Sequence, residues 1–221
     1  MEISGIKAIV FDLWETLIPF PKSLKTKAFL ETAKTLNYEP SQLKPHWEAT
    51  RRIRETIHLE DYFYYLKNEI NANWSDHTIK QAMEVRKSIH GSAFKNPDVY
   101  ALYVFYALQK KGIKTAVISN CSSDVREMLM SSQIGPLIDE VILSSEVGIM
   151  KPDVSIYKIA SDRLNVPVNQ CIFLGDGNDN ELDGAKKAGM NSILMNRGYD
   201  RGWNGSGINQ LSDILTEVEI N

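Results

Sequence analysis

The chain has 221 residues and a formal net charge of −3, from 25 Lys and Arg against 28 Asp and Glu, which argues against a general nucleic-acid-binding surface. The 43% of hydrophobic and 24% of charged residues predict a globular protein with a sizeable core, and the two cysteines exclude a disulfide framework and a four-thiolate zinc site. Because no apolar stretch has the length that a bilayer needs and no secretory signal is recognisable, we expect a cytoplasmic protein without a membrane partner.

The first part of the chain changes from a strand pattern to a helical pattern. Residues 6–11 form a short apolar run that predicts a buried strand. From Pro19 to about Phe94 the apolar residues recur at helical spacing. The pattern predicts four consecutive helices, over 24–36, from 41 towards 58, over 59–70 and over 75–89.

After Pro97, strand and helix patterns alternate. The predicted strands are 114–119, 141–143, 171–174 and 192–195, and the predicted helices are 98–110, 122–131, 153–164, 181–188 and about 211–218. This alternation is typical of a parallel sheet covered by helices on both faces. We therefore predict an α/β fold: a doubly wound, Rossmann-like parallel-sheet core of residues 1–18 and 96–221, with an inserted all-helical domain of residues 19–95.

Polar side chains follow the strands at the edge where such a fold binds its ligands. They are Asp12, Ser119 and Asn120, Asp176, and Lys151 a little further from its strand. Asp12 is suited to attack phosphorus, and Asp12 with Asp176 suits a hard cation such as Mg²⁺. Ser119 can donate a hydrogen bond to a phosphoryl oxygen, and Lys151 supplies positive charge. The set is coherent for phosphate chemistry.

Four motifs in the same order resemble those of the haloacid dehalogenase-like hydrolases. Residues 11–17 (FDLWETL) are similar to the first motif, 117–120 (VISN) to the second, Lys151-Pro152 with Tyr157 to the third, and 174–190 to the fourth. The resemblance covers the predicted core, about two-thirds of the chain. It implies a Rossmann-like hydrolase with a helical cap between the first and second motifs.

The resemblance also implies roles for individual residues. Asp12 would be the nucleophile and a Mg²⁺ ligand, with the backbone carbonyl of Trp14 and the side chain of Asp176 as further ligands. Glu181 matches a second acidic position near the metal and would act through water. From the residues themselves we predict Ser119 and Lys151 as catalytic residues beside Asp12, and Ser119, Asn120 and Lys151 as substrate ligands. The insertion, residues 19–95, would close over the site and select the substrate.

The sequence departs from the phosphatase pattern at Trp14. Phosphatases of this family usually carry a general acid and base, Asp, at that position, and an indole N–H only donates. Such a group is typically worth ~10²–10⁴-fold in rate. Dehalogenases of the family carry Tyr there and need no metal, so hydrolysis of a carbon–halogen bond stays open as an alternative. A non-catalytic ligand-binding module that kept the metal site is a third.

The fourth motif favours the metal-dependent alternative, because Asp176 facing Asp12 without a cation would oppose two negative charges. We therefore predict Mg²⁺-dependent hydrolysis of a small anionic phosphate ester, by a monomer or homodimer, through an aspartyl-phosphate on Asp12.

Other features bear on the substrate without identifying it. Residues 19–95 contain 13 Lys and Arg against 9 Asp and Glu, so a positive lid faces an acidic core, which favours an anionic metabolite. The densest basic cluster, Arg51, Arg52 and Arg54, is interpreted as a solvated helix face. The histidines, all within the insertion, are interpreted as surface residues. The glycine-rich segment 196–207 is interpreted as a surface connection.

Overall fold

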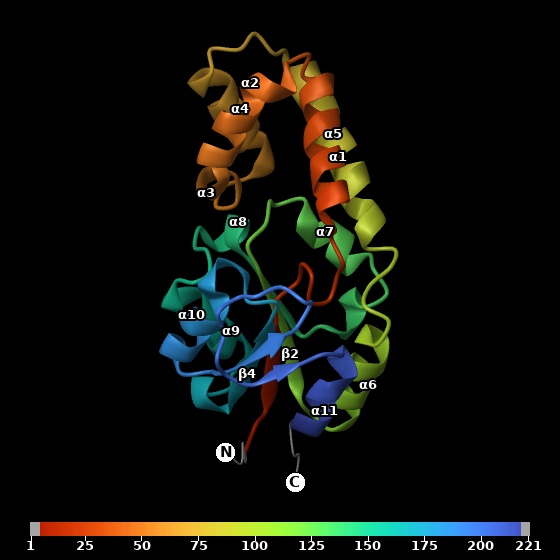
Figure 1. The fold of residues 1–221 in the computed structure, drawn as a ribbon, viewed down its shortest axis with the longest axis vertical. Helices are drawn as coiled ribbons and strands as arrows, with labels where there is room; N and C mark the ends of the chain where they lie inside the picture. The colour runs from red at the N-terminus through yellow and green to blue at the C-terminus, as the bar shows by residue number, and fades with distance from the viewer. Residues whose placement is uncertain (1–4, 218–221) are drawn as a thin grey trace.

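The computed structural model describes residues 5–217, and its core is a six-stranded parallel sheet in the order β3-β2-β1-β4-β5-β6 (Figure 1). The strands are β1 (Ala8–Phe11), β2 (Lys114–Ser119), β3 (Glu140–Leu143), β4 (Cys171–Gly175), β5 (Asn191–Met195) and β6 (Gly207–Ile208). The predicted doubly wound parallel sheet is confirmed. The two-residue β6 was not predicted, because so short a strand has no periodicity.

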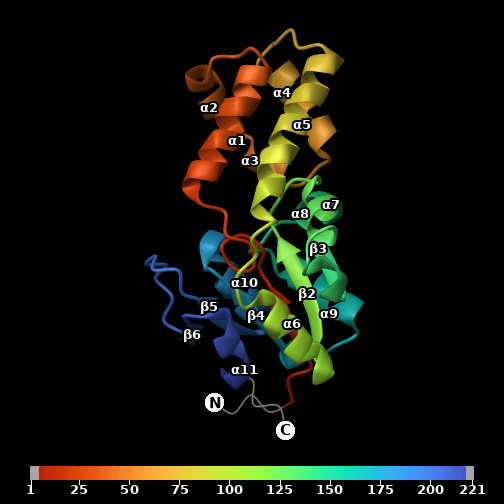
Figure 2. The same ribbon diagram turned by 90° about the vertical axis from the view of Figure 1, so that its right-hand side faces the viewer.

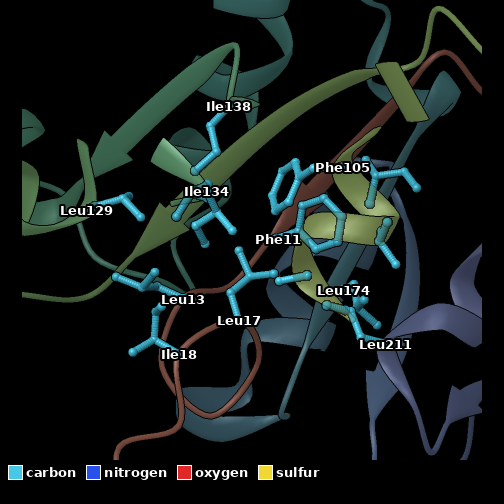
Figure 3. Close-up of a cluster of buried hydrophobic side chains, with 14 of the residues drawn as sticks. Phe11, Leu13, Leu17, Ile18, Phe105, Leu129, Ile134, Ile138, Leu174 and Leu211 are labelled. Carbon is cyan, nitrogen blue, oxygen red and sulfur yellow. The ribbon is translucent and has the colours of Figure 1, made fainter. Parts of the chain in front are cut away.

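Helices cover both faces of this sheet because both faces of its strands are apolar. In β1, Ile9 and Phe11 belong to one buried cluster and Ala8 and Val10 to another. The first cluster includes the facing side of α6 (Ala101–Lys110), and Figure 3 shows Phe11 against Phe105, with ring centroids 5.2 Å apart. The second includes residues of α9 (Val154–Leu164) and α10 (Glu181–Ala188).

The remaining core helices are short. They are α7 (Val125–Met130), α8 (Ser144–Val147) and α11 (Ile214–Glu217), with 3₁₀ turns at Gly135–Leu137, Val168–Gln170, Asn178–Asn180 and Leu211–Asp213. The last predicted helix is therefore found as a 3₁₀ turn followed by α11, and its predicted final residue, Val218, lies outside the described residues.

Five helices form the insertion between β1 and β2, beyond the end of the sheet at which the β2 arrow points (Figure 2). They are α1 (Lys22–Thr35), α2 (Pro40–Ala49), α3 (Arg51–Arg54), α4 (Leu59–Glu69) and α5 (Asp76–Ala93). They enclose an apolar cluster of their own that includes Leu43, Trp47 and Phe63. None of the described helices is both long and apolar enough to span a membrane.

The predicted single helix from 41 towards 58 is wrong, because the chain breaks at Thr50. Thr50 has φ −96° and ψ 15°, and its hydroxyl donates to the carbonyl of His46 at 2.7 Å and contacts the Tyr62 hydroxyl at 2.9 Å. A side chain that bonds back to the preceding turn competes with helix continuation. The break separates α2 from α3.

Candidate active site

Asp12 lies at the end of β1 in a tightly folded loop. Its amide donates to the Leu174 carbonyl of β4 at 2.8 Å, which continues the strand pairing up to the carboxylate. The chain then turns back, since the amides of Leu17 and Ile18 both donate to the Leu13 carbonyl at 2.9 Å. The Thr16 hydroxyl donates to Asp12 Oδ2 at 3.1 Å. The loop thus holds the buried Asp12 side chain at the sheet edge.

Three buried carboxylates meet at this edge. Asp12, Asp176 and Glu181 each place one carboxylate oxygen within 4.8 Å of the others. Gly175 makes the approach of Glu181 possible, because a Cβ atom there would lie 2.2 Å from Glu181 Oε1. The amide of Gly177 donates to that same oxygen at 3.0 Å. Glu181, predicted at the periphery of the metal site, is therefore part of the carboxylate cluster.

The Lys151 ammonium joins two of these carboxylates. It donates to Asp12 Oδ1, to Glu181 Oε2 at 2.5 Å and to the Ile118 carbonyl at 3.2 Å, and the residue is 3% exposed. Burial opposes ionisation of the lysine, but Asp12 and Glu181 raise its pKa above the ordinary value. Burial also raises the pKa of Asp12, and burial together with Asp12 raises the pKa of Glu181 to about 8.

Two further contacts fix Lys151 and Glu181 in place. The Asn120 side chain bonds to the Lys151 backbone at both ends, donating to its carbonyl at 3.0 Å and accepting from its amide at 2.8 Å. The Tyr157 hydroxyl donates to the Glu181 carbonyl at 2.7 Å. The second- and third-motif residues Asn120 and Tyr157 therefore position the lysine and the start of α10.

The predicted substrate ligand Ser119 is the last residue of β2. Its side chain is fully buried, and within residues 5–217 its hydroxyl has no hydrogen-bond partner and does not line the cavity described below. Trp14 does line that cavity. Its ring packs against Phe20 at 4.4 Å and Phe94 at 5.3 Å between centroids, so the indole belongs to the apolar wall.

A cavity of about 370 Å³ separates the sheet edge from the insertion. We call the side formed by Asp12, Lys151, Asp176 and Glu181 its floor. Its roof is formed by side chains of the insertion, namely Trp47, Arg54, Arg86 and His90. This volume is in the range of small-molecule sites.

Arg201 completes the floor, and the sequence did not predict it. Its guanidinium donates to Asp176 Oδ2 at 2.9 Å from the glycine-rich segment after β5. That segment is therefore more than a surface connection. Elsewhere in this segment, Arg197 donates to the Glu15 and Thr16 carbonyls, and Trp203 donates to the Ser206 carbonyl at 2.9 Å.

The insertion is joined to the core beside this floor by an ion pair. Arg51 of α3 donates through both terminal nitrogens to Asp179, at 2.8 and 2.6 Å, and Asp179 also accepts from Asn120 at 3.1 Å. Arg54 is buried, whereas Arg52 is exposed. The interpretation of the three arginines as a solvated face is wrong for Arg51, which pairs with Asp179, and for Arg54, which is buried against Trp47.

The histidine interpretation is also wrong at one position. His46, His58 and His77 are exposed, but His90 is buried against Trp14 and Phe20, with ring centroids 6.1 and 4.9 Å away. Burial lowers the pKa of His90 well below its ordinary value, and Arg86 and Arg54 lower it further. His90 is therefore neutral near pH 7.

Comparisons with known proteins agree with this arrangement. The family described as haloacid dehalogenase-like hydrolase matches residues 6–189. Glyceraldehyde 3-phosphate phosphatase of Methanothermobacter thermautotrophicus is 34% identical to this chain, and the alignment covers 86% of each protein. (S)-2-haloacid dehalogenase 4A of Burkholderia cepacia is 27% identical, and the alignment covers 88% of this chain and 85% of the dehalogenase. A HAD phosphatase structure from Thermococcus onnurineus has a TM-score of 0.71 at 18% identity, covering 98% of this chain and 99% of its own. The chain belongs to the haloacid dehalogenase-like hydrolases.

Proposed function

We propose that this hydrolase cleaves a small anionic phosphate ester with the help of Mg²⁺, through an aspartyl-phosphate on Asp12, and that residues 19–95 cap the site. The observation that carries the proposal is the meeting of Asp12, Asp176 and Glu181 with Lys151 at one end of the cavity. The similarity to a glyceraldehyde 3-phosphate phosphatase supports it.

The donor set of the floor fits a magnesium ion. Three carboxylates place oxygen atoms within 4.8 Å of one another, and Lys151 and Arg201 lie beside them. Mg²⁺ favours carboxylate oxygens and a partly hydrated shell. Asp12 and Asp176, with the Trp14 carbonyl, would hold the ion. It would neutralise charge on the transferring phosphoryl group.

Asp12 performs the covalent step in this proposal. Its carboxylate oxygen forms a bond to phosphorus as the bond from phosphorus to the ester oxygen breaks, and the leaving alkoxide takes a proton from solvent. Water then attacks phosphorus, which releases inorganic phosphate and restores the carboxylate. Lys151 compensates charge on Asp12 and on the phosphoryl oxygens, and Thr16 orients the second oxygen of Asp12.

Substituting Asp12 tests the covalent step. Asp12→Asn should lower kcat for 4-nitrophenyl phosphate below detection, and EDTA should do the same reversibly, because the reaction needs the nucleophile and the ion. Phosphate release measures both effects. The matched control is Asp183→Asn, an exposed carboxylate on α10, which should retain activity. Full activity of Asp12→Asn would contradict the proposal.

Trp14 occupies the position of the usual general acid, and its indole cannot protonate the ester oxygen. We therefore expect the enzyme to prefer substrates with good leaving groups. The ratio of kcat/KM between 4-nitrophenyl phosphate and a hexose 6-phosphate should be about 10²-fold or more, the effect typical of a missing general acid. Equal values would show that another group supplies the proton.

Hydrolysis of a carbon–halogen bond is the second candidate, and the Arg201 contact favours it. Asp176 beside Asp12 needs a metal only if no other cation compensates its charge, and Arg201 pairs with Asp176 directly. The similarity to (S)-2-haloacid dehalogenase 4A points the same way. This candidate predicts halide release from a 2-haloacid that persists in EDTA, and its absence would eliminate the candidate.

A further inference from the structure

Two buried arginines share one aromatic ring in the roof of the cavity. The Arg54 guanidinium carbon lies 4.5 Å from the centre of the Trp47 ring, and that of Arg86 lies 5.5 Å from it. The two residues are 7% and 9% exposed, and both line the cavity. Cation–π attraction to Trp47 stabilises each guanidinium, but it does not cancel the repulsion between them.

Glu55, the carboxylate that Arg54 approaches, is already engaged by Arg51. Both oxygens of Glu55 accept from Arg51 Nε at 3.1 Å, and Arg54 reaches Glu55 only at 3.8 Å. Arg54 also donates to the Trp47 carbonyl at 2.6 Å, which fixes its orientation. The roof therefore holds Arg54 in place without fully compensating its charge.

Arg86 is even less compensated. Its one hydrogen bond to the described part of the chain is to the Ser122 hydroxyl at 3.4 Å, and Ser122 in turn donates to Asp124. Within residues 5–217, Arg86 Nε has no hydrogen-bond partner and the guanidinium forms no ion pair. Burial lowers the pKa of Arg86, an effect that Asp124 opposes and Arg54 reinforces. Burying a cation without an anionic partner costs free energy, and a bound anion would remove this cost.

We propose that Arg54 and Arg86 form a second anion subsite, which binds a carboxylate or phosphate group at the end of the substrate remote from Asp12. The substrate would then be doubly anionic, with its transferred phosphoryl group on the floor and its second anionic group against the roof. A planar guanidinium is well suited to bind either group through paired hydrogen bonds. This inference rests on the proposed function for the phosphoryl end alone.

The test compares two phosphate esters that differ in one group. In 3-phosphoglycerate a carboxylate occupies the place of the neutral hydroxymethyl group of glycerol 3-phosphate. Calorimetric titration in EDTA, which prevents turnover in the proposed reaction, should show about 10-fold or more tighter binding of 3-phosphoglycerate, a gain typical of a charge-assisted hydrogen bond. Wild-type protein that binds both equally, or neither, overturns the proposal.

Variants then assign the preference to the roof. Arg86→Gln should reduce the difference between the two esters to within about twofold, whereas Arg86→Lys should keep part of the difference. Arg52→Gln, an exposed arginine of the same short helix as Arg54, is the matched control and should keep all of it. An Arg86→Gln variant with a native circular dichroism spectrum and an undiminished preference overturns the proposal.

Thermal unfolding provides a second test of the subsite, which does not depend on whether the Arg86→Gln variant folds. Sulfate should raise the Tm of the wild type and of Arg52→Gln more than that of Arg54→Gln, and equal shifts contradict the subsite. Phosphate release with Mg²⁺ reports separately on the proposed function. Selective binding of 3-phosphoglycerate without phosphate release would support the anion subsite and contradict the proposed phosphatase activity. Phosphate release without this selectivity would support the activity and contradict the subsite.

Discussion

The charged groups on the floor of the cavity form ion pairs with one another, whereas a buried arginine in the roof does not. On the floor, Lys151 bridges Asp12 and Glu181, and Arg201 pairs with Asp176. In the roof, Arg86 is buried without an ion pair among the described residues. Side chains whose charges compensate one another are suited to hold a fixed geometry. A buried cation whose charge is not compensated is suited to attract an anion. The difference separates the proposed chemistry from the proposed substrate selection.

The largest expected effect breaks the compensation on the floor. Lys151→Met should lower the free energy of unfolding by about 3–5 kcal/mol, because it leaves buried carboxylates without their cation. Urea denaturation in EDTA measures it, with Lys187→Met, an exposed lysine of α10, as the control. A loss no larger than that of the control would show that the floor does not depend on this ion pair.

A smaller effect is expected from the other cation of the floor. Arg201→Gln frees Asp176 from its ion pair, so Mg²⁺ should bind about 3- to 10-fold more tightly, since a modest ion pair no longer competes with it. Calorimetric titration with MgCl₂ measures the affinity, and Lys186→Gln serves as the control. Weaker binding would mean instead that Arg201 orients Asp176 for the ion.

An effect of similar size concerns pH and the roof. The folded-state pKa of His90 lies below its unfolded value, so on acidification the unfolded chain gains a proton that the folded protein does not, and stability falls. The stability advantage of wild type over His90→Gln should therefore shrink by about 1 kcal/mol between pH 7.5 and pH 5.5. Urea denaturation of both proteins in EDTA measures it. A constant difference would indicate that His90 is not held neutral.

The core could be predicted from the sequence because its signals are local. The alternation of short apolar strands with helices gives the parallel sheet, and Asp12 and Asp176 each follow a strand directly. Parallel strands end at the same edge, so residues 164 positions apart in the chain meet there. Ser119, the last residue of β2, lies at the same edge but does not line the cavity, because successive side chains of a strand point to opposite faces of the sheet.

The roof and the second cation of the floor depend on contacts between distant segments. Arg54 and Arg86 belong to different helices, and only the packing of the insertion brings both to Trp47. Arg201 reaches Asp176 from a loop without periodic pattern. Residue order and spacing determined the family, the sheet and the acidic residues at its edge. Tertiary packing alone decided which charges are buried, which are paired and which remain for a ligand, because burial and distance depend on the whole fold.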